Sequence, residues 1–226
     1  MGSLQHSFDV SVAEARALQE RLRSRVEAAD RLGPVQRVAG ADCSYDRESP
    51  LLWAAVVVLD AATGAVLERA GVCGRARFPY VPGYLSFREL PPLLEAFARL
   101  SRPPDLVLCD GQGLAHPRRF GLACHLGAWL DLPAIGCAKS RLVGEHREPG
   151  PRRGAHVRLR EGAETIGEVV RTRADVRPVY VSIGHRVSLA TARRWVLRLA
   201  PRHRQPEPIR AAHAEVNRLR RERAAG

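Results

Sequence analysis

Three strand-like runs follow one another near the start of the chain, and helices then alternate with strands. The first runs span residues 35–43, 51–60 and 65–73, and a short Ala-Ala-Thr-Gly connection joins the last two as a hairpin. Later strand-like runs cover 105–110, 133–137, 155–160, 164–171 and 178–183, and helical segments cover 11–29, 86–100, 119–130, 188–199 and 208–221. An antiparallel meander followed by this alternation predicts the α/β class, with a mixed sheet and helices on its faces. We expect a single domain over residues 1–226, with short flexible tails at both ends.

The charge of the chain indicates a polyanionic partner. Its 226 residues carry 36 basic and 24 acidic side chains, a formal net charge of +12, and the sequence pI is about 10.7. A pI above about 9 is typical of nucleic-acid binding, and a basic enzyme without such a partner is the alternative. Lys139 is the only lysine among many arginines. Because lysine is a compact point charge on a flexible stem, Lys139 is a candidate functional residue, with chance as the alternative.

The cysteines and the apolar runs indicate the cellular setting. The five cysteines lie in apolar surroundings and none forms a Cys-x-x-Cys pair, so a zinc signature is missing. Free thiols of this kind are typical of a reducing cytosol. The N-terminus has no apolar signal-peptide core, and the longest apolar stretch, near residues 51–59, is too short to cross a bilayer. The sequence predicts a cytoplasmic protein without membrane association.

Two of the apolar runs end on an aspartate. Val-Ala-Gly-Ala leads to Asp42, and Leu-Val-Leu-Cys leads to Asp110. If the first strand of the meander pairs with the strand at 105–110, the two carboxylates stand side by side and repel each other unless a cation lies between them. Oxygen ligands without cysteine favour Mg²⁺ or Mn²⁺ over zinc. Each aspartate taken alone is equally consistent with a turn former at the end of a strand.

Two further residues are candidates for the same site. Glu89 lies at the start of a helix and could supply a third carboxylate. Ser86 precedes it by three residues, so the pair also matches a capping box, which needs no metal. His213 lies in the last predicted helix, and its spacing does not distinguish it from the seven other histidines.

A loop rich in proline and aromatic residues precedes Glu89. Pro79 and Pro82 flank Tyr80 and Val81. Prolines on both sides stiffen an aromatic side chain, which suits a wedge that enters a base stack. A proline-rich turn with Tyr80 packed on the protein surface is the other interpretation.

Four blocks of the sequence together resemble the endonuclease V family. They are residues 41–45 (Ala-Asp-Cys-Ser-Tyr), 79–89 (Pro-Tyr-Val-Pro-Gly-Tyr-Leu-Ser-Phe-Arg-Glu), 110–121 (Asp-Gly-Gln-Gly-Leu-Ala-His-Pro-Arg-Arg-Phe-Gly) and 206–213 (Pro-Glu-Pro-Ile-Arg-Ala-Ala-His). Residues 136–140 and 181–186 fit the same family, and the resemblance runs from about residue 10 to residue 221. It implies an RNase H-like mixed sheet, with an antiparallel meander and then parallel strands, flanked by helices on both faces.

The resemblance also implies an activity and a cofactor. The expected reaction is Mg²⁺-dependent hydrolysis of the second phosphodiester bond on the 3′ side of inosine, leaving 3′-hydroxyl and 5′-phosphate ends. Mn²⁺ is expected to substitute for Mg²⁺. By the family pattern the metal would be held by Asp42, Glu89 and Asp110. His213 would lie near the metal, and Lys139 would be a catalytic or phosphate-contacting cation.

The other implied roles concern the DNA base. Tyr80 would be the wedge, within the segment Pro79, Tyr80, Val81 and Pro82. The pocket for the flipped hypoxanthine would be lined by Gly83, Leu85, Gly111, Gly113 and Leu122. The chain departs from the family pattern at Cys43, Gln112 and Tyr84, and none of these is an expected ligand.

Several cationic side chains are candidate phosphate contacts. His116, Arg118 and Arg119 follow the second aspartate, and Arg152, Arg153, Arg158 and Arg160 lie in and after a later polar loop. A solvated basic surface is the alternative for each residue. Together they predict a steep dependence of binding on salt.

We expect the substrate to be DNA that contains deoxyinosine. We also expect the protein to be a monomer. Single-stranded DNA and RNA stay open as substrates, because the sequence does not show how a 2′-hydroxyl would be received. An inosine-specific endoribonuclease is therefore one alternative function. A non-catalytic nucleic-acid-binding protein and a structure-directed nuclease on the same scaffold are two others.

Overall fold

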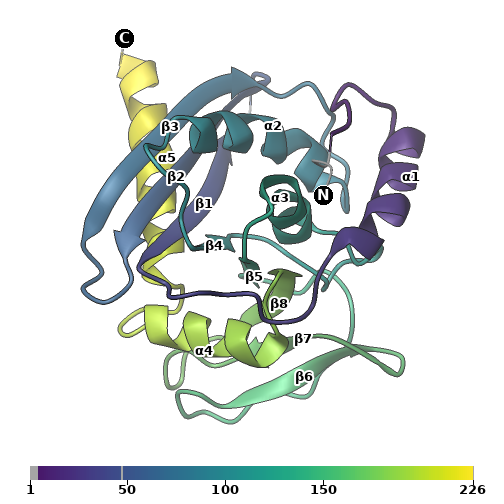
Figure 1. Ribbon diagram of the computed structural model, residues 1–226, viewed down its shortest axis with the longest axis vertical. Helices are drawn as coiled ribbons and strands as arrows, with labels where there is room; N and C mark the ends of the chain where they lie inside the picture. Colours follow the sequence, from purple (N-terminus) through teal and green to yellow (C-terminus); the bar gives the residue numbers. More distant parts are fainter. Residues whose placement is uncertain (1–4, 47, 226) are drawn as a thin grey trace.

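The structure is a computed structural model that describes residues 5–46 and 48–225. A sheet of eight strands lies at its centre, in the order β3-β2-β1-β4-β5-β8-β7-β6 (Figure 1). The strands are β1 (Arg37–Tyr45), β2 (Leu51–Asp60), β3 (Val66–Arg75), β4 (Leu106–Cys109), β5 (Ala134–Ala138), β6 (His156–Glu161), β7 (Glu164–Val170) and β8 (Val179–His185). Every predicted strand is confirmed: β2, β4 and β5 are apolar and buried along most of their length, whereas the edge strands β3 and β6 are largely exposed.

The sheet is mixed, as predicted. Strands β1, β2 and β3 form the antiparallel meander, and β1 pairs in parallel with β4, which pairs in parallel with β5. The parallel pairing ends at β5, since β8 runs antiparallel to it and β6, β7 and β8 form a second antiparallel meander. The links between these last three strands are too short for the helical crossover that a parallel pair needs.

Helices cover both faces of the sheet (Figure 1). One face carries α2 (Leu85–Ala98) and α3 (Leu122–Leu130), and the other carries α4 (Leu189–Leu199) and α5 (Glu207–Ala225). Alternate residues of β1 point to the two faces: Ala39 and Ala41 join the core under α2 and α3, and Val38 joins the core under α4 and α5.

Helix α1 (Val12–Leu22) begins as its sequence predicts. The Ser11 hydroxyl accepts a hydrogen bond from the Glu14 backbone N–H at 3.3 Å, and the Glu14 carboxylate accepts one from the Ser11 N–H at 2.8 Å. The capping box is therefore confirmed. The helix ends at Leu22 and continues as a 3₁₀ turn at Arg23–Arg25, earlier than the predicted end at residue 29.

The second capping box is not formed. Helix α2 begins one residue before Ser86, so Ser86 lies inside the first turn and its side chain does not cap the helix. The Ser86 hydroxyl instead contacts Nδ1 of the buried His125 at 3.1 Å. The capping interpretation of Glu89 is therefore wrong, and its carboxylate has a different environment, described below.

Helix α5 lies directly on strand β1 because Gly40 has no side chain. A Cβ atom built at Gly40 would lie 1.9 Å from the backbone oxygen of Pro208, in the first turn of α5. The close approach places the following turns of α5 beside the second half of β1, where Asp42 lies.

The flexible tails predicted from sequence lie partly outside the described residues, since they include residues 1–4 and 226. The described N-terminal segment packs on the helix layer: His6 Nε2 lies 2.8 Å from His125 Nε2, and the ring of Phe8 contacts Trp129. Across residues 5–46 and 48–225, the helices are all too short or too polar to span a lipid bilayer.

Candidate active site

The two predicted aspartates are neighbours where the parallel pairing of β1 with β4 ends. Ala41 pairs with Cys109 across the parallel strands, and the Asp110 backbone N–H donates to the Ala41 carbonyl at 3.2 Å. Asp42 and Asp110 follow these paired residues and both line one pocket. The predicted pairing of β1 with β4 is therefore confirmed, and it brings the two aspartates together.

Each aspartate has a cationic or imidazole partner. Nζ of Lys139, which comes directly after β5, lies 2.6 Å from Oδ2 of Asp110. Nδ1 of His213, on α5, lies 2.8 Å from Oδ2 of Asp42. Lys139 and His213 remain partly exposed to the pocket that the aspartates line, whereas Asp42 is buried. Residues from β1, β4, β5 and α5 thus meet at one place.

Glu89 lies deeper than the aspartates. Its side chain is 6% exposed, and it does not line the pocket that Asp42 and Asp110 share within the described chain. The hydroxyl of Tyr45 donates a short hydrogen bond to the Glu89 carboxylate, and the Arg88 guanidinium lies 4.9 Å from the centre of the Tyr45 ring. Tyr45 therefore orients this carboxylate, a role that sequence analysis missed although Tyr45 belongs to the first of the four blocks.

Burial changes the acidity of Asp42 and Glu89. Desolvation, together with the charge of Asp110, raises the pKa of Asp42 to about 6. Desolvation also raises the pKa of Glu89 to about 8, and the charges of Asp42 and Asp110 act in the same direction, while the Tyr45 hydrogen bond opposes them. An added positive charge would offset the cost of ionising Asp42 and Glu89 at this site.

The donor set fits a hard divalent cation. Asp42, Asp110 and Glu89 offer only carboxylate oxygens, and Mg²⁺ commonly binds one or two carboxylates and keeps several waters. In the described residues, histidine, cysteine, aspartate and glutamate side chains do not converge as a group of three or more potential ligands. His213, Lys139 and Tyr45 each contact one of the three carboxylates. The residues thus match Mg²⁺ in chemistry, and their carboxylates are paired with protein groups.

The pocket beside the aspartates extends to the predicted base site. Its volume is about 440 Å³, within the size range of small-ligand pockets. The wall includes four residues predicted to contact the base, namely Gly83, Leu85, Gly111 and Leu122. Gly113 is not in this wall within the described chain; it packs against β8, where its N–H donates to the Ser182 hydroxyl at 2.8 Å.

The predicted wedge segment lies at the rim of this pocket. Tyr80 is 70% exposed, and Pro79 and Pro82 are exposed beside it. Tyr80, Val81 and Pro82 contribute to the pocket lining. A ring this exposed packs little against the protein and is accessible to a bound nucleic acid, and its role as a wedge stays a prediction.

The cations predicted to contact phosphate after Asp110 have partners within the protein. His116 is 4% exposed, and its Nε2 lies 2.9 Å from the Gly83 carbonyl oxygen, which also accepts from Arg118 at 2.6 Å. Arg119 forms ion pairs with Glu161 and Glu164 at 2.6 and 2.7 Å. A phosphate contact by these residues stays a prediction and would require these donors to change partners.

The later arginines differ from one another. Arg152, Arg158 and Arg160 have exposed side chains, as a phosphate contact requires. Arg153 donates to the carbonyls of Leu197 and Ala200 at the end of α4. Arg153 thus holds a helix end, and its predicted phosphate contact is not tested by this arrangement.

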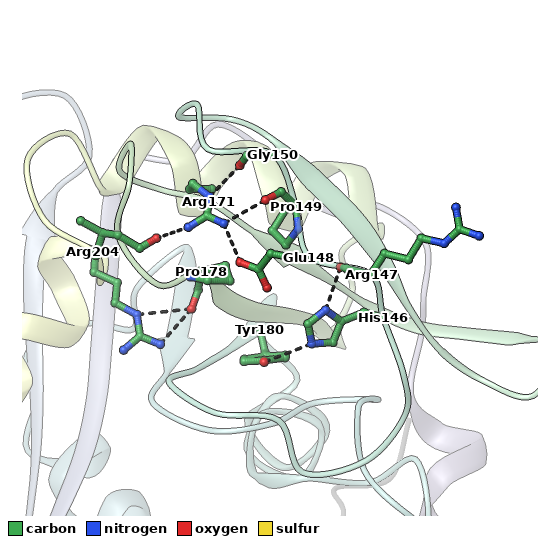
Figure 2. A network of polar contacts seen from close by, with 10 residues as sticks. His146, Arg147, Glu148, Pro149, Gly150, Arg171, Pro178, Tyr180 and Arg204 are labelled. Atoms are coloured by element: carbon green, nitrogen blue, oxygen red, sulfur yellow. Dashed lines mark hydrogen bonds and ion pairs between the residues drawn. The ribbon is translucent and has the colours of Figure 1, made fainter.

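The polar loop over residues 144–154 is held by a buried arginine (Figure 2). Arg171 donates to the carbonyls of Gly150, Pro149 and Val176, and it forms an ion pair with Glu148 at 2.6 Å. Figure 2 shows these contacts converging on one guanidinium group. The loop is therefore tied to β7 and to the β7–β8 connection.

A second arginine of the same region holds the backbone of the catalytic lysine candidate. Arg204 Nη2 donates to the Pro178 carbonyl at 2.8 Å, seen in Figure 2, and to the Lys139 carbonyl at 2.5 Å. Gln112 donates to the next carbonyl, that of Ser140, at 2.9 Å. Sequence analysis missed Arg204, since an arginine in a loop among many arginines carries no distinguishing signal.

The comparisons with known proteins agree with this site. The chain matches the endonuclease V family over residues 20–214. It is 53% identical to the endonuclease V of Roseiflexus castenholzii, over 94% of this chain and 95% of that protein.

Solved structures give the same result. The crystal structure of endonuclease V from Streptomyces avermitilis is 46% identical, with a TM-score of 0.91 over 95% of each chain. The endonuclease V of Ciona intestinalis, solved in complex with a 24mer DNA containing an inosine followed by a ribo-adenosine, is 28% identical, with a TM-score of 0.81 over 93% of this chain and 98% of that one. The mixed sheet, the four sequence blocks and these relatives lead to one conclusion: the chain belongs to the endonuclease V family of nucleases.

Proposed function

We propose that this protein is an Mg²⁺-dependent endonuclease that recognises deoxyinosine in DNA. It hydrolyses the second phosphodiester bond on the 3′ side of the lesion and leaves 3′-hydroxyl and 5′-phosphate ends. One observation carries the proposal: a single pocket is lined both by the Asp42–Asp110 pair and by the wedge segment with four predicted base contacts. The Ciona relative bound to inosine-containing DNA supports the choice of base.

The carboxylates prepare the cleavage end of the pocket. Asp42 and Asp110 would hold Mg²⁺, with Glu89 as the third carboxylate of the group. A divalent cation bound there supplies Lewis acidity toward the scissile phosphate and toward the attacking water. The Tyr45 hydroxyl holds one of the two Glu89 carboxylate oxygens, and the other oxygen would be the one to contact a cation.

Lys139 and His213 supply charge and proton transfer. The Lys139 ammonium group, 44% exposed beside Asp110, can move its contact to a phosphate oxygen and stabilise negative charge that develops during cleavage. The Asp42 carboxylate contacts Nδ1 of His213 and so orients the ring. The other ring nitrogen, Nε2, would then take or give the proton.

The wedge segment explains recognition of a lesion within a duplex. Inosine pairs weakly, so its extrusion costs less than that of a normal base. Tyr80, exposed at the pocket rim between two prolines, would fill the gap that the extruded base leaves. The base itself would enter the cavity beside Leu85 and Leu122.

Replacing Tyr80 by alanine is expected to weaken binding to an inosine duplex about tenfold, while binding to single-stranded inosine DNA changes less than about twofold. The physical reason is that only a duplex has a stacked gap to fill. Fluorescence anisotropy in EDTA with labelled duplex and single strand measures both affinities. Val66→Ala, which changes another exposed apolar side chain on strand β3, serves as the control. Equal losses on duplex and single strand would contradict the wedge role.

The metal-free protein is expected to lose stability as the pH rises from about 5 to about 8. The pKa of Asp42, about 6, and that of Glu89, about 8, both lie above the ordinary values of 3.8 and 4.5. Over this range the folded chain keeps protons that the unfolded chain has released, so rising pH favours unfolding. For the same reason, Mg²⁺ should stabilise the protein more at pH 8 than at pH 5.

Melting temperatures across this pH range, in EDTA and in Mg²⁺, measure the effect. Glu89→Gln removes one of the titrating groups, so the difference between wild type and this variant isolates its contribution. A pH dependence in EDTA that is identical in the two proteins would contradict the assignment of a raised pKa to Glu89.

A nicking assay tests the proposed function directly. The substrate is one labelled duplex with and without a single deoxyinosine, beside a matched inosine-containing RNA, in Mg²⁺ and in EDTA. The expected product is a Mg²⁺-dependent nick one nucleotide beyond the inosine on its 3′ side, in the lesion duplex. Binding without cleavage, unchanged by EDTA, would identify a non-catalytic nucleic-acid-binding protein. Cleavage of the undamaged duplex at the same rate would identify a structure-directed nuclease.

RNA is the second candidate substrate. The DNA bound by the Ciona relative carries a ribo-adenosine after its inosine, so a 2′-hydroxyl at that position is accommodated in that protein. Preferential cleavage of the RNA in the nicking assay would move the function to inosine-containing transcripts and retain the same site. We further propose that the protein acts in the cytoplasm as a monomer and accepts Mn²⁺ in place of Mg²⁺; light scattering and metal replacement in the same assay test the last two points.

A further inference from the structure

One backbone carbonyl at the base of the wedge loop accepts three side-chain hydrogen bonds. The Gly83 oxygen lies 2.6 Å from Nη2 of Arg118, 2.9 Å from Nε2 of His116 and 3.1 Å from Nε2 of Gln19. Gly83 directly follows the wedge segment 79–82 and has a φ of +80°, a conformation that glycine adopts without strain. A turn of the loop is therefore fixed at the point where it enters α2.

Gln19 joins this turn to two other parts of the chain. Its side chain is fully buried on α1, where it also donates to the Phe120 carbonyl at 3.2 Å and accepts from Nε of Arg118 at 2.5 Å. A buried amide that lacked such partners would be costly, so these three contacts explain a polar residue on the buried face of an amphipathic helix. Helix α1, the 116–120 segment and the wedge loop are thus connected through one side chain.

His116 is a neutral donor in this cluster. Desolvation, helped by the charge of Arg118, lowers the pKa of His116 to about 4. Its Nδ1 accepts a hydrogen bond from the Arg118 backbone N–H at 3.2 Å, so the hydrogen is on Nε2, which faces the Gly83 carbonyl. Arg118 lies over the Tyr84 ring, 4.1 Å from its centre, and therefore contacts both Gly83 and the residue that follows it.

The position of Gly83 makes the cluster relevant to recognition. Gly83, His116 and Leu85 all line the pocket, and Tyr80 lies at its rim. A shift of the Gly83 carbonyl would move the wedge relative to the base cavity, and a displacement of about 1 Å is enough to impair a positioned site.

We propose that Gln19 is a positioning residue for the wedge: with His116 and Arg118 it fixes the Gly83 carbonyl, and so sets where Tyr80 stands relative to the base pocket. The inference rests on the proposed function for its effect on inosine recognition. Gln19 does not line the pocket in the described chain, so its influence on recognition is transmitted through Gly83.

Two substitutions separate the contacts of Gln19. Gln19→Met keeps the length of the side chain and removes every hydrogen bond. Gln19→Glu keeps the acceptor for Arg118 and removes the donors to Gly83 and Phe120. Gln36→Met, at an exposed glutamine, is the matched control.

The first readout is the ratio of the affinities for an inosine duplex and an undamaged duplex, measured in EDTA. Both Gln19 variants are expected to lower this ratio about tenfold, with affinity for the undamaged duplex unchanged, because the nonspecific phosphate contacts do not depend on the loop. The fold-change corresponds to about 1.4 kcal/mol. Folded Gln19 variants with the wild-type ratio would overturn the proposal.

The second readout does not depend on the substrate. Hydrogen exchange of the loop amides at Tyr80, Val81, Gly83 and Tyr84 should be faster in Gln19→Met than in the wild type, with residues 207–213 of α5 unchanged. If the wild-type protein does not discriminate inosine, the proposed function fails and this measurement still decides the anchoring. Exchange that is equal in the loop of both proteins, or faster throughout the variant, would overturn the anchoring role.

Discussion

Replacing Asp110 by asparagine is expected to reduce the rate of nicking at deoxyinosine by at least about a thousandfold, which corresponds to about 4 kcal/mol of lost transition-state stabilisation. The substitution removes a carboxylate next to Asp42 and leaves Lys139 without its partner at 2.6 Å. An amide carries no net charge, so it attracts Mg²⁺ less than a carboxylate does and does not neutralise the Lys139 ammonium group. Single-turnover cleavage of a labelled inosine duplex in Mg²⁺ measures the rate.

Binding should survive the same substitution. Asp110 is one negative charge in a chain of net charge +12, so its removal favours the approach of DNA. Affinity for the inosine duplex in EDTA is therefore expected to be unchanged or higher. Asp175→Asn is the matched control, because Asp175 is exposed and has a φ of +59°, which asparagine also adopts. Cleavage by Asp110→Asn at the rate of this control would refute the metal assignment.

The core of the candidate site could be predicted from sequence because it follows from strand pairing. The apolar runs that end at Asp42 and Asp110 are long enough to identify as strands, and pairing them places the two carboxylates together. Lys139 follows a third strand of the same parallel group, so it reaches the same edge of the sheet. These positions depend on backbone topology, which the order of the segments determines.

The surroundings of the site could not be predicted because they depend on burial. Ser86 and Glu89 match a capping box in sequence, and only the earlier start of α2 shows that Ser86 faces His125. Arg118 and Arg119 read as a basic surface, yet their donors contact Gly83, Glu161 and Glu164. The order of residues in a loop does not show which side chains face the protein interior.

The helix pattern of α1 identifies Gln19 as a polar residue on the buried face. Gln19 lies four residues after Ala15 and three before Leu22, on the face of α1 that is buried. A polar side chain at such a position needs partners, which is a signal that the sequence contains. The identity of those partners, the carbonyls of Gly83 and Phe120, depends on tertiary contacts that the helix pattern does not encode.

Gly40→Ala is expected to destabilise the protein by about 3 kcal/mol, at the upper end of the usual cost of overpacking. The added Cβ would lie 1.9 Å from the Pro208 oxygen, 2.1 Å from its carbonyl carbon and 2.7 Å from the Ile209 nitrogen. These are backbone atoms of the first turn of α5, so a side-chain rotation cannot relieve the contact. The helix must move away from β1, and the melting temperature is expected to fall by about 10 °C.

The same displacement should impair the site. Because α5 carries His213, moving its first turn away from β1 lengthens the 2.8 Å contact between His213 and Asp42, so nicking by the folded fraction of Gly40→Ala should also be slower. Gly74→Ala on β3 is the matched control, since a Cβ there meets no atom within 4 Å and the melting temperature should stay close to that of the wild type. If Gly40→Ala has the same melting temperature as this control, the close packing of α5 on β1 does not depend on Gly40. The position of His213 must then have another cause.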